Sequence, residues 1–156
     1  MTLEEVQNSS LEDRKEILEM FTESTAYMLS HFWCSAVENV RYGGGFAQVG
    51  VFFLLAITEI GPVEYWVIVG DLPPLYLDTN DDQIDTAAEA LDMYTYAMDI
   101  WVEKWSGVDS KWKVPPVVSR REFKPVQPTK QNVEKLRSRL EFLRREVVPF
   151  LQQDLD

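Results

Sequence analysis

Apolar side chains recur at helical spacing in three long stretches of the chain. These stretches cover residues 10–32, 83–106 and 129–153, and in each the apolar positions step by three, four or seven residues. Such spacing places them on one face of an α-helix. The pattern therefore predicts three long helices, of which the last is basic on its other faces and is loosened near its end by Pro149, which has no backbone N–H.

The first helix has a less regular pattern than the other two. Ser10 can cap its first turn, because a serine side chain accepts a hydrogen bond from the free N–H groups there. A rotated apolar stripe that includes Val37 and Val40 would carry the helix on to the run Gly43-Gly44-Gly45, which would end it. Since a helix of that length is unusual in a globular domain, we expect a break near residues 30–35.

A strand-like pattern fills the region between the first two helices. Residues 46–59 and 63–70 are almost all apolar, β-branched or aromatic, and Ile60-Gly61-Pro62 between them is a turn signal, so they predict a β-hairpin. Neither strand has a polar face. We therefore expect helices or a second subunit to cover the sheet on both sides. Three strands or fewer are visible, so a homodimer formed through the sheet or a helical seam is one hypothesis.

These elements predict a single α+β domain over residues 1–156, with a small antiparallel sheet centred on the hairpin and covered by the three helices. A chain of this length, 46% hydrophobic, can bury one sizeable core. Residues 107–128 hold four prolines and predict an irregular connection, with one short strand at Val117-Val118. Residues 129–153 form the basic C-terminal helix.

The charge is distributed unevenly along the chain. Its net charge is −11, but residues 1–110 carry 20 acidic and 4 basic side chains, whereas residues 111–156 carry 6 acidic and 11 basic ones. Either the basic C-terminal helix docks on an acidic body, or an acidic face is kept for a basic partner. Direct binding to nucleic acid is not expected, because it relies on clustered Lys and Arg.

The remaining bulk features favour the cytoplasm. The first residues show no signal-peptide pattern, and the longest apolar stretch, residues 49–60, is too short to span a membrane. A single cysteine, Cys34, excludes a disulfide within the chain, and a single histidine, His31, excludes multi-histidine metal sites. On a helix these two residues would share a face, but both fit buried structural roles. We expect no catalytic set, cofactor or metal.

The favoured functional hypothesis is a non-enzymatic, acidic protein-binding module. A bacterial immunity or inhibitor protein that neutralises a cationic nuclease is one concrete example, because opposite charges speed association. Part of the acidic set superficially resembles a calcium loop but lacks its central Gly and terminal Glu, and a solvated helix cap explains it as well. The predicted partner-binding residues are Asp78, Asp81, Asp82, Asp85, Glu89, Asp92 and Asp99, with Trp112 as an exposed aromatic anchor.

The alternative hypothesis is a small-molecule binder or hydrolase with its site at the end of the second strand. Asp71 directly follows that strand and could act as a base or hydrogen-bond acceptor, with Trp66 and Tyr76 as further ligand contacts. Asp71 could equally fix the turn before Leu72-Pro73-Pro74, as Asp commonly does.

The same segment resembles a known signature. The run Trp66-Val67-Ile68-Val69-Gly70-Asp71-Leu72-Pro73, followed by Tyr76, is similar to the W-V-I-x-G-D-L-P-x-x-Y pattern of a family of small bacterial proteins that share a domain of unknown function. The resemblance covers roughly residues 33–105. It departs from the pattern at Pro74 and in lacking a Pro before the first strand. It implies a shared fold and no known activity.

Overall fold

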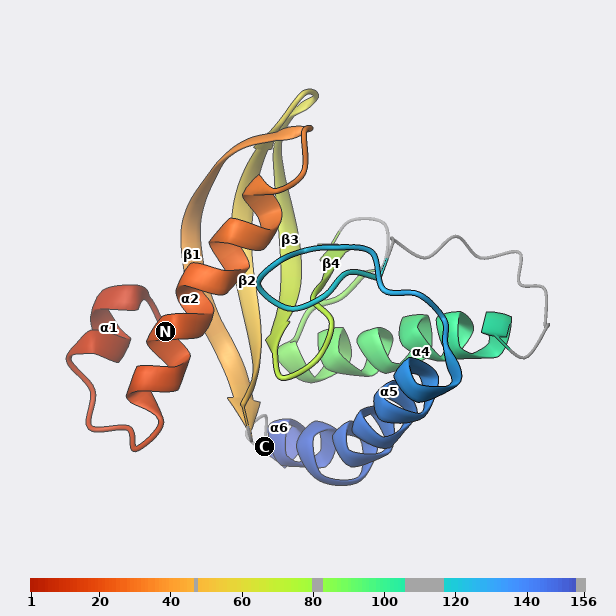
Figure 1. Cartoon of the computed structure of the whole chain (residues 1–156). Helices are drawn as coiled ribbons and strands as arrows, with labels where there is room; N and C mark the ends of the chain where they lie inside the picture. Colours follow the sequence, from red (N-terminus) through yellow and green to blue (C-terminus); the bar gives the residue numbers. More distant parts are fainter. Residues whose placement is uncertain (47, 80–82, 106–116, 154–156) are drawn as a thin grey trace.

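The chain folds around an antiparallel sheet in a computed structural model that describes residues 1–46, 48–79, 83–105 and 117–153. Four strands pair in chain order, and helices cover both faces of the sheet (Figure 1). The α+β class is therefore confirmed. The strands are β1 (Cys34–Phe46), β2 (Val49–Thr58), β3 (Gly61–Gly70) and β4 (Leu75–Asp78); the helices are α1 (Leu3–Gln7), α2 (Arg14–Leu29), α4 (Ala87–Trp105), α5 (Lys130–Phe142), the π-helical turn η1 (Leu143–Val147) and α6 (Val148–Gln153).

Each face of the sheet buries its own hydrophobic cluster. On one face Phe52 and Val67 pack with residues of α1 and α2. On the other, Val51 and Ile68 pack with residues of α4, α5, η1 and α6. Because neighbouring residues of a strand point to opposite faces, the all-apolar hairpin supplies both clusters. The prediction of a sheet covered on both sides is confirmed, and the cover comes from helices of the same chain.

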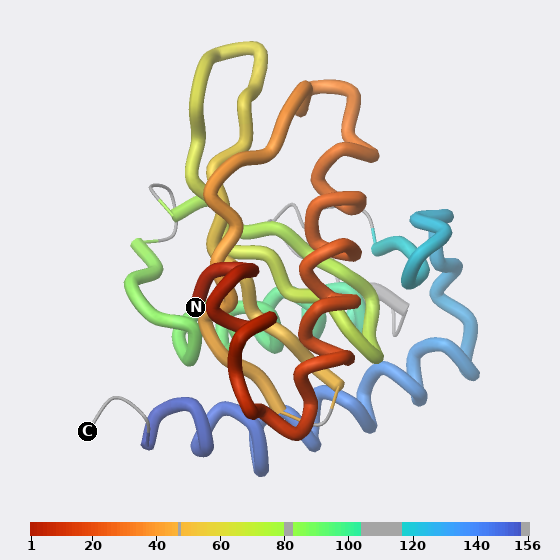
Figure 2. The backbone as a smooth tube through the Cα atoms, turned by 90° about the vertical axis from the view of Figure 1, so that its left-hand side faces the viewer, coloured from red at the N-terminus to blue at the C-terminus, as the bar shows by residue number. Residues whose placement is uncertain are grey.

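The tip of the β2–β3 hairpin extends beyond the helices, as both ribbon views show (Figures 1 and 2). Ile60 in this tip is 91% exposed, and Phe32, between α2 and β1, is 90% exposed. Since the chain's own helices cover the rest of the sheet, its apolar faces no longer require a second subunit. The homodimer therefore stays a prediction, and the need to cover the apolar faces of the sheet no longer supports it.

The extension of the first helix to residue 42 was wrong. Helix α2 ends at Leu29, within one residue of the expected break, and residues 34–46 form β1 instead. The sheet register shifts between Glu38 and Arg41, around Asn39, whose φ is +54°. This bulge places the inward-facing residues Val37 and Val40 three positions apart, which imitates helical spacing. The tertiary pairing with β2 therefore overrides the local pattern.

The predicted ends of several other elements also need correction. Ser10 caps no helix: α2 begins at Arg14, and Asp13 precedes it without a side-chain cap. A short helix, α1, was not predicted; Thr2 and Glu5 cap it by accepting hydrogen bonds from each other's backbone N–H. The described sheet has four strands rather than three or fewer, because β1 pairs with β2 and β4 pairs with β3 directly after the prolines of the connecting loop.

The C-terminal helix is interrupted as its proline predicts. Helix α5 passes into the π-helical turn η1, and α6 follows it. Pro149 lacks the N–H that would continue the α-helical ladder across this turn. Of the predicted connection over residues 107–128, the first part, residues 107–116, lies outside the described residues. The second part is a loop with one bridge between Val118 and Pro125, at the predicted short strand.

Candidate functional site

A cavity of about 290 Å³ lies where the loop between β3 and β4 meets α5. The loop at residues 117–126 and the end of α4 complete its walls. Its apolar lining consists of Leu72, Pro73, Trp101, Val117, Val126 and Leu136, and its polar lining of Asp71, Ser119, Arg120, Asn132, Lys135 and Arg139. Apolar walls with a few polar groups are typical of small-molecule sites.

The end of β3 places Asp71 at this cavity. Gly70 has a φ of +126°, and a Cβ atom there would lie 2.0 Å from the carbonyl oxygen of Gln48, so only glycine fits. The Asp71 backbone N–H then donates to the same oxygen at 2.9 Å. Pro73 and Pro74 have no N–H for the sheet, so the chain leaves it here. These local constraints fix Asp71 beside the cavity.

Tyr94 of α4 forms a hydrogen bond with the same loop. Its hydroxyl donates to the carbonyl oxygen of Pro73 at 2.6 Å. Burial raises the pKa of Tyr94 well above its ordinary value, so the phenol keeps the proton that it donates. The β3–β4 loop is thus anchored at Gly70 and at Pro73.

Arg139 approaches the loop from α5. Its Nε donates to the carbonyl oxygen of Asp71 at 3.1 Å, and its Nη2 lies 3.9 Å from Asp71 Oδ2. The guanidinium also lies over the ring of Phe142, 5.1 Å from its centroid. Among the described residues, Nη2 is buried without a hydrogen-bond partner. The cavity therefore contains a carboxylate–guanidinium pair with one donor left unsatisfied.

The other α5 residues at the cavity follow from helix geometry. Asn132, Lys135, Leu136 and Arg139 are spaced by three, one and three residues, which puts them on one face of the helix. Two basic side chains of the C-terminal helix, Lys135 and Arg139, thus line the cavity beside the loop that carries Asp71.

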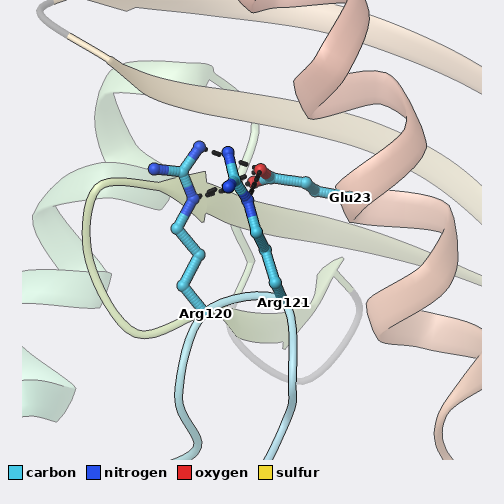
Figure 3. Close-up of polar contacts among 3 residues, drawn as sticks. All are labelled: Glu23, Arg120 and Arg121. Atoms are coloured by element: carbon cyan, nitrogen blue, oxygen red, sulfur yellow. Dashed lines mark hydrogen bonds and ion pairs between the residues drawn. The ribbon is translucent and has the colours of Figure 1, made fainter.

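Two ion pairs tie the loop at residues 117–126 to α2. Arg120 Nη2 lies 2.8 Å from Glu23 Oε1, and Arg121 Nε lies 3.3 Å from the same oxygen (Figure 3). The Glu23 side chain is only 13% exposed. Charge-assisted hydrogen bonds of this kind hold a loop more firmly than neutral ones, so they fix one wall of the cavity.

The structure does not bring Trp66 and Tyr76 to Asp71. Trp66 lies on the α4 side of the sheet, where its Nε1 donates to the carbonyl oxygen of Ile84. Tyr76 lies on the α2 side and packs against the rings of Tyr27 and Trp33. In the register of β3 and β4, Trp66 pairs with Leu77 and Tyr76 with Val67, so the two rings point to opposite faces.

The predicted acidic face is brought together only in part. Asp85, just before α4, and Glu89 and Asp92, in its first turns, are exposed, whereas Asp99 forms an ion pair with Arg144 of η1. Asp78 is half-buried at the end of β4. Asp81, Asp82 and Trp112 lie outside the described residues. The ion pairs of Asp99, Asp71 and Glu23 support docking of the basic C-terminal third on the acidic body.

His31 and Cys34 do not form a reactive pair on a helix. His31 lies in the turn after α2 and packs against aromatic rings, while Cys34 begins β1 and its thiol donates to the carbonyl oxygen of Ala36. Burial raises the pKa of the Cys34 thiol, which disfavours the nucleophilic thiolate. Within the described ranges, no cluster of three or more His, Cys, Asp or Glu side chains could hold a metal ion.

Sequence reasoning missed most of the cavity. It named Asp71, but not Lys135, Arg120 or Trp101 as site residues. The four-residue spacing of Lys135 and Arg139 in a basic helix was a signal for a basic helix face. Nothing in the sequence shows that this face meets the β3–β4 loop.

Comparison with known proteins does not assign the chain to a family. No protein-family model matches the chain, and no curated protein or solved structure is significantly similar to it. The resemblance to the W-V-I-x-G-D-L-P signature therefore stays a prediction. Among the described helices, none has both the length and the apolar composition required to cross a bilayer.

Proposed function

We propose that this chain is a binding protein for a small organic molecule, and that its site is the cavity between the β3–β4 loop and α5. The observation that carries this proposal is the pairing of Asp71 with Arg139 in the cavity wall, which leaves the buried Nη2 of Arg139 without a hydrogen bond. Unsatisfied polar groups are rare in folded proteins, and a ligand atom is one means of satisfying them.

A screen of small organic fragments by ligand-observed NMR tests this proposal. Val126 lines the cavity, so Val126→Trp should fill it and abolish fragment binding. Gln127→Trp is a matched control, because Gln127 is exposed and does not line the cavity. We expect fragments that bind the wild type and the control but not Val126→Trp. Absence of any binder, or binding that survives in Val126→Trp, would contradict the proposal.

A second candidate function is recognition of a basic protein through the acidic start of α4. It is supported by the exposed carboxylates of Asp85, Glu89 and Asp92, two of which are spaced three residues apart on one helix. Asp99 is neutralised by its ion pair with Arg144, so the acidic surface does not extend as far along α4 as Asp99. In this function the protein would act as an inhibitor or immunity protein, with association speeded by opposite charge.

Charge reversal tests the second candidate function. A partner captured from the native host should lose affinity as salt rises, and should bind at least about tenfold more weakly to the triple variant Asp85→Lys, Glu89→Lys, Asp92→Lys. Reversal of Glu134 and Glu141, which are exposed on α5, is the control. Affinity that is insensitive to salt, or equal in both variants, would rule out this face.

A further inference from the structure

The cavity is lined by positive charge although the chain as a whole is strongly negative. Three cationic side chains, Arg120, Lys135 and Arg139, and one carboxylate, Asp71, contribute to its walls. The net charge of the whole chain is −11. The overall negative field of the chain would repel an anion. An anion that binds in this cavity therefore depends on the cationic side chains of its walls.

Two of these three cations have partners within the chain. The Arg120 guanidinium donates to both carboxylate oxygens of Glu23, at 2.8 to 3.3 Å. Arg139 lies beside Asp71. Among the described residues, no carboxylate lies within ion-pair distance of Lys135. Glu23 is shared with Arg121, so Lys135 is the cation of the described lining that has no carboxylate partner, and the cavity carries an excess of positive charge.

The hydrogen-bonding groups of the cavity also favour an acceptor. Nη2 of Arg139 has no acceptor among the described residues. Ser119 Oγ accepts from the backbone N–H of Lys124, which leaves its O–H to donate. The ammonium of Lys135 is a donor only. Beside the acceptor oxygens of Asp71 and Asn132, the polar side of the cavity therefore offers donors on Arg139, Ser119 and Lys135.

The opposite side of the cavity is apolar. Trp101, Val117 and Leu136 contribute to it, and a polar molecule would lose hydrogen bonds with water there without replacement. The volume of about 290 Å³ lies at the small end of the range of small-molecule sites, which is roughly 300–1,000 Å³. It suits a compact apolar body with one polar end.

We propose that this site binds a small monocarboxylate with an apolar, aryl-sized body. The carboxylate pairs with Lys135 and accepts hydrogen bonds from the Arg139 side, and the apolar body lies against Trp101 and Leu136. Because Lys135 is the one cation of the described lining that has no carboxylate partner, a singly charged carboxylate fits the site better than a doubly charged phosphate. This inference rests on the proposed binding function and specifies its ligand class.

Titration with matched probes tests the ligand class. The probes are a panel of arylalkanoates, including 3-phenylpropanoate, each with its neutral amide, and phenyl phosphate as the dianion. Affinity is measured from chemical-shift changes in ¹⁵N-labelled protein. We expect each bound carboxylate to bind about tenfold more tightly than its amide, since a charge-assisted hydrogen bond contributes a factor of this size, and more tightly than phenyl phosphate.

A matched pair of variants assigns this preference to one side chain. Lys135→Met should weaken carboxylate binding about tenfold and leave amide binding unchanged. Arg137→Met is the control, because Arg137 is an exposed cation on the same helix that does not line the cavity. Equal effects of the two variants would overturn the assignment to Lys135.

The outcomes separate this inference from the binding function itself. If acids and amides bind equally and both are lost in Val126→Trp, the site is a ligand site but the carboxylate preference is wrong. If phenyl phosphate binds more tightly than every carboxylate, the charge argument is wrong and the binding function stands. If no probe binds although fragments from the screen do, the ligand class is wrong and the binding function stands. If no fragment or probe binds, or if binding survives in Val126→Trp, both proposals fail.

Discussion

The two faces of the sheet are covered in different ways. On the α2 side, α2 lies along the sheet next to α1, and the ring of Tyr76 packs against those of Tyr27 and Trp33 at centroid distances of 6.2 and 5.3 Å. On the other side, two helices and two loops meet around the cavity. Hollows also lie beside α2, but their described linings contain no basic side chain. The cavity at α5 differs in its chemistry, because its apolar walls carry Asp71 together with three cationic side chains.

The largest expected effect is the removal of a ring from the α2 side. Phe52 is fully buried, and its ring centroid lies 4.9 Å from that of Phe21. Phe52→Ala should lower the free energy of unfolding by about 3–5 kcal/mol in urea denaturation, because it removes buried area and leaves a cavity. Phe32→Ala, at a ring that is 90% exposed, should change it by no more than about 0.5 kcal/mol. Similar losses in both variants would contradict the packing described for the α2 side.

Alkaline pH should weaken both sides of the sheet. Burial raises the pKa of Tyr27 on the α2 side and of Tyr94 on the cavity side above the ordinary value of 10.0. Above that pH the unfolded chain loses these phenol protons while the folded chain keeps them, so the free energy of unfolding falls as pH rises. Each tyrosine should account for a loss of about 1.4 kcal/mol by about pH 11. Urea denaturation of wild type and Tyr94→Phe measures it; an unchanged pH dependence in the variant would exclude Tyr94.

Neutralising Glu23 should loosen the cavity side selectively. Glu23→Gln removes the charge that holds Arg120 and Arg121, at an expected cost of about 1–2 kcal/mol. The Val126 N–H, which donates to the carbonyl oxygen of Val117, should then exchange faster with solvent. The control is Glu122→Gln, because Glu122 forms an exposed ion pair with Lys124 and such pairs contribute little. Unchanged exchange at Val126 would show that the loop is held by other contacts.

The smallest expected effect is the release of the β3–β4 loop. Tyr94→Phe removes the hydrogen bond to the Pro73 carbonyl and should cost about 1 kcal/mol at neutral pH. Tyr96→Phe, at a ring that is 53% exposed, should leave stability unchanged. Thermal unfolding of both variants measures the difference. A Tyr94→Phe variant as stable as wild type would show that this hydrogen bond is not needed to anchor the loop.

The hairpin and the burial of both its faces could be predicted from the sequence, because two apolar, β-branched runs on either side of a turn are a local signal. Strand β1 could not be, because the bulge at Asn39 changed the spacing of Val37 and Val40 from the strand period to one that resembles a helix. The apolar pattern correctly indicated that Val37 and Val40 face inward, but it did not show that a bulged strand, rather than a helix, turns them inward.

The candidate site shows the same division. Asp71 could be predicted, because Gly70 and the two prolines mark the end of a strand. Its pairing with Arg139 could not, because the two residues are 68 positions apart and meet only through packing of α5 on α4. The acidic residues of α4 were recognised, but the neutralisation of Asp99 by Arg144 also depends on this packing.

The π-helical turn η1 sets the rotational phase of the C-terminal helix. A π-turn holds one residue more than an α-helical turn, so α6 is rotated by about 100° from the direction that a continuous α-helix would give it. In this orientation Leu151 packs closely on Gly44 of β1. A Cβ atom added to Gly44 would lie 2.8 Å from Cδ2 of Leu151. Deleting one residue within η1 would straighten the helix and turn Leu151 away from the strand. The single extra residue therefore acts as a spacer that places Leu151 of α6 against β1, the edge strand of the sheet.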